Sequence, residues 1–363
     1  TEKMKLLLLI VLVIGTSITT IAQENYKISG KIEGMADGTL LLISEERGVV
    51  DTLGITPIIN EAFEFTGTTD KPIGAYITTT DQQGIIPLIL ENANFTIFAG
   101  TSGVIIQGGF QQEIYNRFCK INTEIIQLQT QTELQLTEQK GNNSKVQTLI
   151  NQFNQFLENA QAKEKKLLQE YADTYVAAYV IFSSMQQMEL ETLKGRYSLL
   201  GENAKSTIPG QAIANLIAQQ EKLTEGNVAP DFTIKKNDGN SIVLRNTKGK
   251  VKLIHFWASW SIPCRQENIS LLKIYQKYHT KGLEIISISL DNNRMEWLKA
   301  VGEDGMIWEN GSDLKGQQSE IARLFFVKNL PHSLLLDENN VIVAKNLRDD
   351  ALREKIAEQL KGK

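Results

Sequence analysis

The C-terminal part of the chain alternates between strand-like and helix-like patterns, and this alternation restricts the possible folds more than any other feature. Apolar runs of strand length, KVKLIHFWA and LEIISISLD, are each followed by a segment with helical spacing, the first being Pro263–Tyr278. A pair of short strands around residues 238–239 precedes them, two more lie around 338–340, and DDALREKIAEQLKGK ends the chain. Residues 226–363 are therefore expected to form an α/β domain, a central sheet flanked by helices.

Two earlier stretches have different periods. Residues 24–105 contain short apolar or alternating runs, such as YKISGKI and AFEFTG, separated by Gly, Asp, Asn and Pro. This spacing predicts a small antiparallel β-sandwich. Residues 110–222 are rich in Gln and carry Ile, Leu and Phe at helical intervals. They predict packed helices, with a break at 141–144 (GNNS) and a last helix that starts near Pro209.

The N-terminus has the pattern of a signal peptide. Lys3 and Lys5 precede an apolar run, and small residues follow it before Gln23. The apolar run is shorter than the ~20 residues that a membrane span needs. We expect residues 1–22 to direct export to the bacterial periplasm, with no stable membrane span and with membrane association only if the segment is not cleaved. The remaining boundaries are a β-sandwich domain at 23–108, a helical connector at 109–225 and the α/β domain at 226–363.

Composition excludes several classes of function. The formal net charge is −4 and no basic stripe is present, which argues against a nucleic-acid partner. The two cysteines, Cys119 and Cys264, are far apart, so they form no disulfide framework. They also lack the spacing of a metal site, and there is no phosphate-binding glycine loop. We expect no metal and no cofactor. Cys119 lies among helical apolar positions and is expected in the core.

One motif carries chemistry. HFWASWSIPCRQE, residues 255–267, follows a predicted buried strand and leads into a predicted helix. It reads like a redox active site in which Ser261 takes the place of the first of two cysteines and Cys264 is the second.

Several ordered features give the C-terminal region its resemblance. VAPDF opens the domain, FWASW leads into the motif, SISLD follows the motif helix, Leu330-Pro331 comes later, and LLLDENNVIV is the closing hairpin. Residues 226–363 thereby resemble the thioredoxin superfamily, specifically the exported TlpA/ResA-like thiol-disulfide oxidoreductases. The β-sandwich resembles the small DUF4369-like domain that precedes such domains in exported Bacteroidetes proteins. The resemblance implies a thioredoxin-like fold, protein thiols or disulfides as substrates, and a cis peptide bond before Pro331.

The resemblance also implies that the residue at 261 should be the nucleophile. A dithiol enzyme attacks with an exposed cysteine at the helix N-terminus, and a second cysteine one turn later resolves the mixed disulfide. Serine is far less acidic than a thiol and forms no stable mixed disulfide. This chain therefore cannot run the two-cysteine cycle by itself, and it supports at most one-thiol exchange through Cys264.

Three functions remain open for this motif. Cys264 could act as a lone nucleophile that exchanges with partner thiols. Ser261 and Cys264 also match the Thr-x-x-Cys of single-cysteine peroxiredoxins, although Trp257 stands where those enzymes carry a proline. Third, the domain could bind an extended peptide in the groove beside Leu330-Pro331 without chemistry, with Cys264 as a buried small hydrophobe. A homodimer is compatible with the protein-binding function.

Other residues are placed beside the motif by the resemblance. His255 would lie beneath Cys264 and could take its proton, although a hydrogen-bonded structural histidine is the favoured interpretation. Trp260, Ile262, Pro263, Leu330 and Pro331 would line the substrate groove. Glu267 could be a catalytic acid, but we expect it to stabilise the helix N-terminus. His332 would lie beside the site, and His279 would cap the motif helix.

Overall fold

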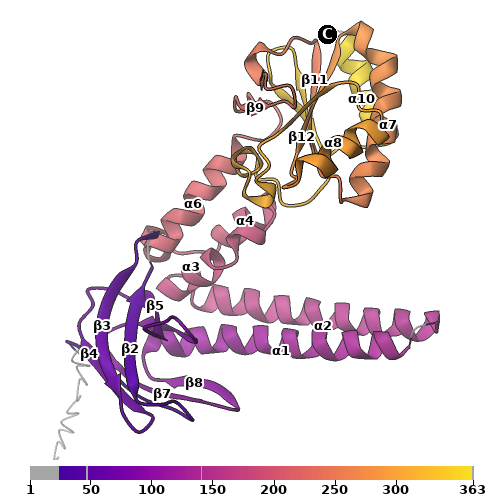
Figure 1. Cartoon of the computed structure of the whole chain (residues 1–363). Coiled ribbons are helices and arrows are strands. Elements are labelled where there is room, and N and C mark those ends of the chain that lie inside the picture. Colours follow the sequence, from indigo (N-terminus) through magenta and orange to yellow (C-terminus); the bar gives the residue numbers. More distant parts are fainter. Residues whose placement is uncertain (1–23, 46–47, 140, 362–363) are drawn as a thin grey trace, which may run out of the picture. The chain divides into compact units, whose positions relative to one another are not determined.

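The computed structural model describes residues 24–45, 48–139 and 141–361, so the expected signal peptide at 1–22 lies outside the described residues (Figure 1). The chain forms two compact units. The first contains the described residues up to Val180 together with Leu199–Gly210. The second contains Ile181–Ser198 and the chain from Gln211 onward.

The first unit begins with a β-sandwich of two four-stranded sheets, in the orders β4-β1-β7-β8 and β3-β2-β5-β6. The strands are β1 (Tyr26–Ile32), β2 (Gly38–Ser44), β3 (Asp51–Ile58), β4 (Ala62–Gly67), β5 (Ile73–Thr79), β6 (Ile85–Leu90), β7 (Asn94–Gly100) and β8 (Gly103–Gln107). Alternate residues such as Ile28, Phe63 and Phe65 point into a shared apolar core. The predicted sandwich is confirmed, with one departure: β1 and β7 pair in parallel, because the chain visits the other sheet between them.

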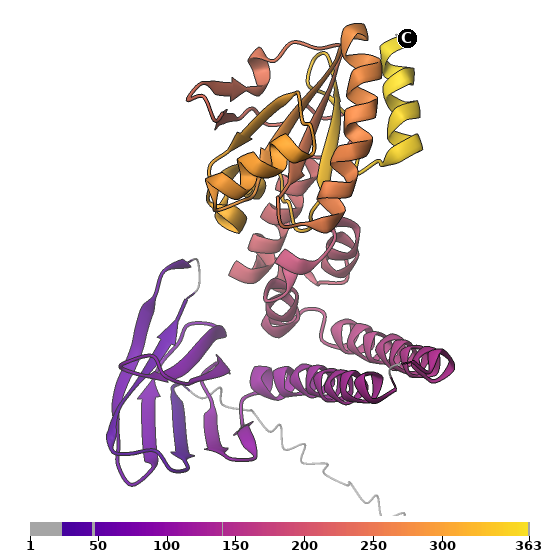
Figure 2. The same cartoon turned by 45° about the vertical axis from the view of Figure 1, so that its right-hand side comes forward.

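A long helical hairpin follows the sandwich. Helices α1 (Phe110–Glu138) and α2 (Asn143–Glu170) lie side by side in both views (Figures 1 and 2). Gly108 and Gly109, with φ of 97° and 79°, make the turn from β8 into α1 in a backbone region that favours glycine. Asn142 caps α2 by accepting a hydrogen bond from the backbone N–H of Lys145 at 3.2 Å, so the predicted break is confirmed.

Shorter helices follow the hairpin: α3 (Tyr175–Phe182), α4 (Leu190–Tyr197), α5 (Glu202–Ser206) and α6 (Ile208–Glu221). Helix α2 ends at Glu170, and α3 begins at Tyr175. At the start of α6 the Thr207 hydroxyl accepts a hydrogen bond from the N–H of Gly210 at 3.2 Å. The predicted start of a last helix near Pro209 is confirmed.

The second unit contains a five-stranded mixed sheet in the order β13-β12-β11-β14-β15. Its elements are β9 (Thr233–Lys235), β10 (Ser241–Val243), β11 (Val251–Trp257), α7 (Ile262–Tyr278), β12 (Leu283–Ser289), α8 (Arg294–Glu303), β13 (Glu309–Ser312), α9 (Glu320–Leu324), β14 (His332–Asp337), β15 (Ile342–Lys345) and α10 (Asp349–Lys361). Strand β11 is parallel to β12 and antiparallel to β14. This arrangement is the expected thioredoxin-like α/β fold.

The central strand β11 separates two apolar cores. Val251, Leu253 and Trp257 pack with α7, α8 and α10 on one face of the sheet. Ile254 and Phe256 pack on the opposite face with α9 and the β9–β10 hairpin. Because side chains alternate along a strand, His255 points to the face of α7. The sheet therefore brings His255 beneath the motif helix.

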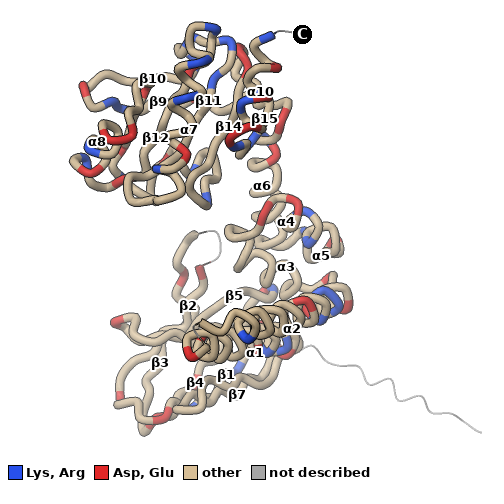
Figure 3. Tube along the Cα trace, turned by 90° about the vertical axis from the view of Figure 1, so that its right-hand side faces the viewer, with Lys and Arg blue, Asp and Glu red and all other residues tan. Residues whose placement is uncertain are grey.

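Charge is mixed over each unit. Acidic and basic residues are interspersed along the described part of the trace (Figure 3). Within the described ranges, no helix is long and apolar enough to cross a bilayer. The same part of the chain holds no cluster of three or more His, Cys, Asp or Glu side chains that could bind a metal ion.

Candidate functional site

The motif forms the junction between β11 and α7. Ser261 is the N-cap of α7, and its Oγ accepts a hydrogen bond from the backbone N–H of Cys264 at 3.4 Å. Pro263 stands in the first turn, where its missing N–H costs nothing. Ser261 thus caps α7, and serine is one of the residues that helix N-caps favour.

Asp291 holds the loop that leads into Ser261. Its side chain is buried and accepts hydrogen bonds from the backbone N–H of Ser259 at 3.0 Å and from the Ser259 hydroxyl at 2.6 Å. The Ser289 hydroxyl donates to it at 2.7 Å. Asp291 was not predicted from the sequence as a site residue, although its position just after β12, in SISLD, places it at the same end of the sheet as the motif.

Cys264 lies inside the protein. Its residue is 0% exposed, packed in the core that α7 shares with β11. Burial raises the pKa of its thiol, with a smaller contribution from the charge of Glu267, while hydrogen bonds involving Ser261 and Ala258 and the charge of Arg348 act in the opposite direction. In this structure the Cys264 thiol is shielded from solvent.

A groove opens beside the motif. Trp260 and Ile262 are 63% and 72% exposed. A cavity of about 440 Å³ is lined by Trp260, Ser261, Leu290, Gln317, Ala322 and the segment 327–330. The Leu330–Pro331 peptide bond is cis. Of the predicted groove residues, Trp260 and Leu330 line this cavity, while Ile262 and Pro263 lie at the start of α7 and Pro331 lines a different cavity.

A network of polar side chains lies beneath the motif. His255 Nε2 lies 3.6 Å from Glu267 Oε2, and Arg348 Nη1 contacts the other carboxylate oxygen of Glu267. Arg348 also donates a hydrogen bond to the carbonyl of Pro331 at 2.6 Å. On the other side His255 Nδ1 lies 3.1 Å from Ser287 Oγ. These side-chain contacts connect the core of the sheet to the segment that carries the cis peptide bond.

Glu267 differs from our expectation. We expected it to stabilise the helix N-terminus, but α7 begins at Ile262 and has no acidic residue in its first turn. The side chain of Glu267 is only 8% exposed and lies between His255 and Arg348. Burial alone would raise its pKa, but His255 and Arg348 outweigh burial and hold the pKa below its usual range. Glu267 is therefore a charged group inside the protein, and Arg348 is a functional candidate that sequence reasoning missed.

The remaining predicted residues are dispersed. Cys119 is exposed on α1, so the expectation of a core cysteine was wrong: the helix turns Phe118, and not Cys119, toward the core. His279 follows the end of α7 as predicted and stacks on Tyr275 at 4.5 Å between ring centroids. His332 begins β14, where its ring faces Phe256, and it lines the same second cavity as Pro331.

Two family models match the chain. Redoxin matches residues 224–360, and the domain of unknown function DUF4369 matches residues 26–115. Among curated proteins, a thiol-disulfide oxidoreductase ResA from Bacillus thuringiensis (strain Al Hakam) is 32% identical over 145 residues, which cover 40% of this chain and 79% of that protein. A ResA from Bacillus anthracis gives the same identity and coverage.

Solved structures include similar domains. The thioredoxin domain of a thiol-disulfide oxidoreductase from Bacteroides vulgatus is 34% identical, with 38% of this chain and 98% of that chain covered and a TM-score of 0.36. A thiol-disulfide oxidoreductase from Bacteroides fragilis is 29% identical, with 36% and 98% covered and a TM-score of 0.35.

Proposed function

We propose, starting from the fact that this chain belongs to the ResA-like thiol-disulfide oxidoreductases of the thioredoxin superfamily, that it has lost the dithiol cycle and uses the family groove to bind extended protein segments. The single observation that carries this proposal is the burial of Cys264 beside an open groove. The position that should hold the attacking sulfur holds the helix-capping oxygen of Ser261. The only sulfur of the motif is out of reach of a partner.

The groove has the features of a polypeptide site. Trp260 offers a large, rigid apolar surface with a polar tip, the kind of side chain that dominates binding at protein interfaces. The segment 327–330 also lines this cavity, and we propose that an extended chain pairs with this segment in the manner of an added strand. Side-chain pockets would then supply selectivity while backbone hydrogen bonds supply affinity.

One-thiol exchange through Cys264 is the second candidate function. It is favoured by the groups around the sulfur: the hydrogen bonds involving Ser261 and Ala258 and the charge of Arg348 each lower the thiol pKa. Burial opposes them and outweighs them in this structure. Exchange would therefore require an opening of the first turn of α7. No specific observation favours the peroxidase function.

Binding of an unfolded, disulfide-free polypeptide tests the proposal. The probe is fluorescein-labelled ribonuclease A, reduced and carbamidomethylated so that it carries no free thiol, and the readout is fluorescence anisotropy. We expect Trp260→Ala to weaken binding about tenfold, as for loss of an interface anchor, and Cys264→Ala to leave binding unchanged. The matched control is Met295→Ala, an exposed apolar residue on α8.

Two results would contradict this function. Equal binding by the Trp260→Ala and Met295→Ala variants would show that the groove is not the binding surface. A requirement for Cys264 would instead favour thiol exchange, provided that it appears with a free-thiol or disulfide form of the probe and not with the alkylated form.

We also propose that the protein acts after export. The support is the pattern of residues 1–22, two lysines followed by an apolar run and small residues. Mass spectrometry of the protein recovered from the periplasm would show an N-terminus near Gln23. Recovery with residues 1–22 intact in the cytoplasm would contradict export. We also propose that the domains extend over residues 23–108, 109–225 and 226–363.

A further inference from the structure

A second cavity lies within the second unit, lined by different side chains from those of the groove. Its volume is about 170 Å³, enough for about five or six water molecules at ~30 Å³ each. Helices α4 and α6 border it on one side, and the segment before β14 and the end of β15 border it on the other. It shares Lys328 and Asn329 with the groove, but none of the motif residues 255–267 lines it.

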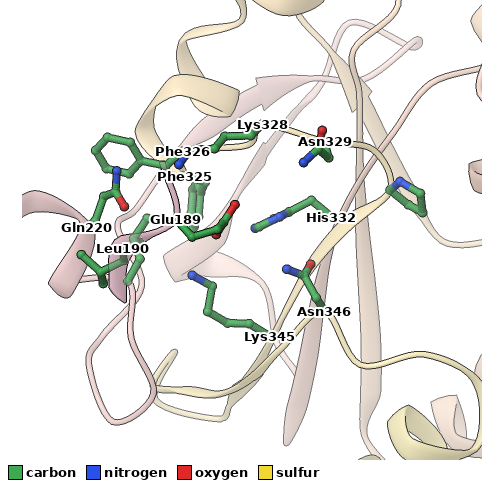
Figure 4. A pocket seen from close by; sticks show the side chains of 12 residues that line it. Glu189, Leu190, Gln220, Phe325, Phe326, Lys328, Asn329, His332, Lys345 and Asn346 are labelled. Atoms are coloured by element: carbon green, nitrogen blue, oxygen red, sulfur yellow. The ribbon is translucent and has the colours of Figure 1, made fainter. Parts of the chain in front are cut away.

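Charged and polar groups converge on this cavity. The carboxylate of Glu189, the ring of His332 and the ammonium group of Lys345 point toward one another from three different elements (Figure 4). The amide of Asn346 lies beside them; its oxygen accepts a hydrogen bond from the N–H of Ser333 at 2.9 Å, so its NH₂ group remains a donor. The cavity is thus lined by one carboxylate (Glu189), two ammonium groups (Lys345 and Lys328) and several neutral polar groups.

Several polar atoms around the cavity have no hydrogen-bond partner in the described part of the chain. Glu189 and Lys345 face each other, and the charge of Glu189 acts on Lys345, but within the described residues their side chains are not close enough to form a direct ion pair. His332 Nε2 and Gln220 Nε2 are buried and have no hydrogen-bond partner, and Gln220 as a residue is only 7% exposed. Unpartnered buried polar atoms are unfavourable and rare in native proteins. Their presence around one space indicates a missing polar occupant.

The charges define the chemistry of that occupant. Lys328 already donates to the carbonyl of Met188, so Lys345 is the cation that remains available. A purely anionic ligand would satisfy Lys345 but meet the carboxylate of Glu189, and a purely cationic ligand would meet Lys345. Only a ligand with both a carboxylate and a nearby donor, such as an ammonium group, satisfies both sides.

We propose that this cavity binds a small amino acid as its zwitterion, with the carboxylate on Lys345 and the NH₂ of Asn346, and the ammonium group on Glu189. His332 and Gln220 contribute further hydrogen bonds. The available volume restricts the ligand to small side chains. The inference is independent of the proposed function, because it uses neither Cys264 nor Trp260.

Isothermal titration of the full chain with glycine and L-alanine tests the inference. Acetate and methylamine, each carrying one of the two charges, are the matched probes. On the wild-type protein we expect saturable binding of the amino acids and binding at least about tenfold weaker for acetate and methylamine, which lose one charge-assisted contact each. Glu189→Gln and Lys345→Met should each weaken glycine binding by about tenfold or more.

Matched controls use exposed charges outside the cavity. Glu191→Gln on α4 and Lys299→Met on α8 should bind glycine like the wild type, and so should Trp260→Ala, whose loss of polypeptide binding is a separate result. The inference is overturned if no amino acid gives a saturable signal, which would mean that water alone fills the cavity. It is also overturned if acetate or methylamine binds the wild type as tightly as glycine, a comparison that needs no variant to fold.

Discussion

At the scale of single residues, Ser261 and Cys264 are each unsuited to thiol-disulfide exchange, for different reasons. Ser261 provides an oxygen where exchange needs a sulfur, and that oxygen is engaged as a helix cap. Cys264 provides the sulfur but is buried, and burial raises its pKa. The loop and helix that would present a nucleophile are intact around them, held by Asp291.

Ser261→Cys should therefore restore the missing chemistry. The new thiol would stand at the N-terminus of α7, where the helix dipole and free N–H groups favour a thiolate, three residues before Cys264. We expect reduction of insulin in the presence of dithiothreitol to rise from the uncatalysed rate to at least about tenfold above it. The control is Ser261→Cys combined with Cys264→Ala, which lacks the resolving thiol. A wild-type protein that already matches the Ser261→Cys variant would contradict this account.

His332 is a residue whose burial has a measurable effect on stability. Burial, with Lys345 and Arg348 contributing, lowers the pKa of His332 to about 4, whereas the unfolded chain titrates near 6.5. As the pH falls from about 6.5 toward 4, the unfolded state binds a proton that the folded state does not, so stability is lost over this window and is retained above it.

His332→Asn should remove this pH dependence. Between pH 7 and pH 4.5 the wild type should lose about 1 to 3 kcal/mol more of its free energy of unfolding than the variant does. Urea denaturation followed by tryptophan fluorescence measures it, because all four tryptophans, at 257, 260, 297 and 308, lie in the second unit. Identical pH profiles for the two proteins would show that His332 titrates normally in the folded state.

At the scale of elements, the ends of β11 and β12 are joined through one side chain. Asp291 follows β12 and binds the backbone and hydroxyl of Ser259, which follows β11. Asp291→Ala should lower the free energy of unfolding of the second unit by about 2 to 4 kcal/mol, because a buried charged acceptor with several donors is lost. Asp350→Ala, an exposed acid at the start of α10, should change it by less than about 0.5 kcal/mol. Equal effects would contradict the assigned role.

Elements with a clear period were predictable from the sequence, and those with a weak period were not. Strands β1, β2, β4 and β7 and helices α7 and α10 follow patterns that periodicity identifies. Three strands were missed. Gly54 and Pro57 weaken the strand pattern of β3, and β8 and β13 are only five and four residues long. Their partners in the sheets, rather than their own composition, define them.

The candidate site was predictable to a similar extent. The motif, the groove beside Trp260 and the cis bond at Leu330–Pro331 follow from the ordered resemblance. The pairing of Glu267 with Arg348 does not, because the two residues are far apart in sequence and meet only when α10 packs against α7. The second cavity could not be predicted from the sequence either, because it combines residues from α4 and the β14–β15 hairpin that no local pattern connects.

At the scale of the whole molecule, a protein of the thiol-disulfide oxidoreductase family carries a thioredoxin-like domain, and we propose that this domain has lost dithiol exchange because Ser261 stands in place of the attacking cysteine. The Redoxin model matches residues 224–360, and the sandwich and helical hairpin lie outside that region. Acidic and basic residues are interspersed along the described trace of both units (Figure 3). The accessibility of the Cys264 sulfur decides between a polypeptide-binding protein and a thiol enzyme.

Alkylation of Cys264 with iodoacetamide, as a function of pH, measures that accessibility directly. The protein carries Cys119→Ala, because Cys119 is exposed and would react first. We predict labelling at least about 100-fold slower in the native state than in urea, with no acceleration below the usual thiol pKa of about 8.5. Rapid native labelling with an apparent pKa well below 8.5 would contradict the central claim and would show a live thiolate.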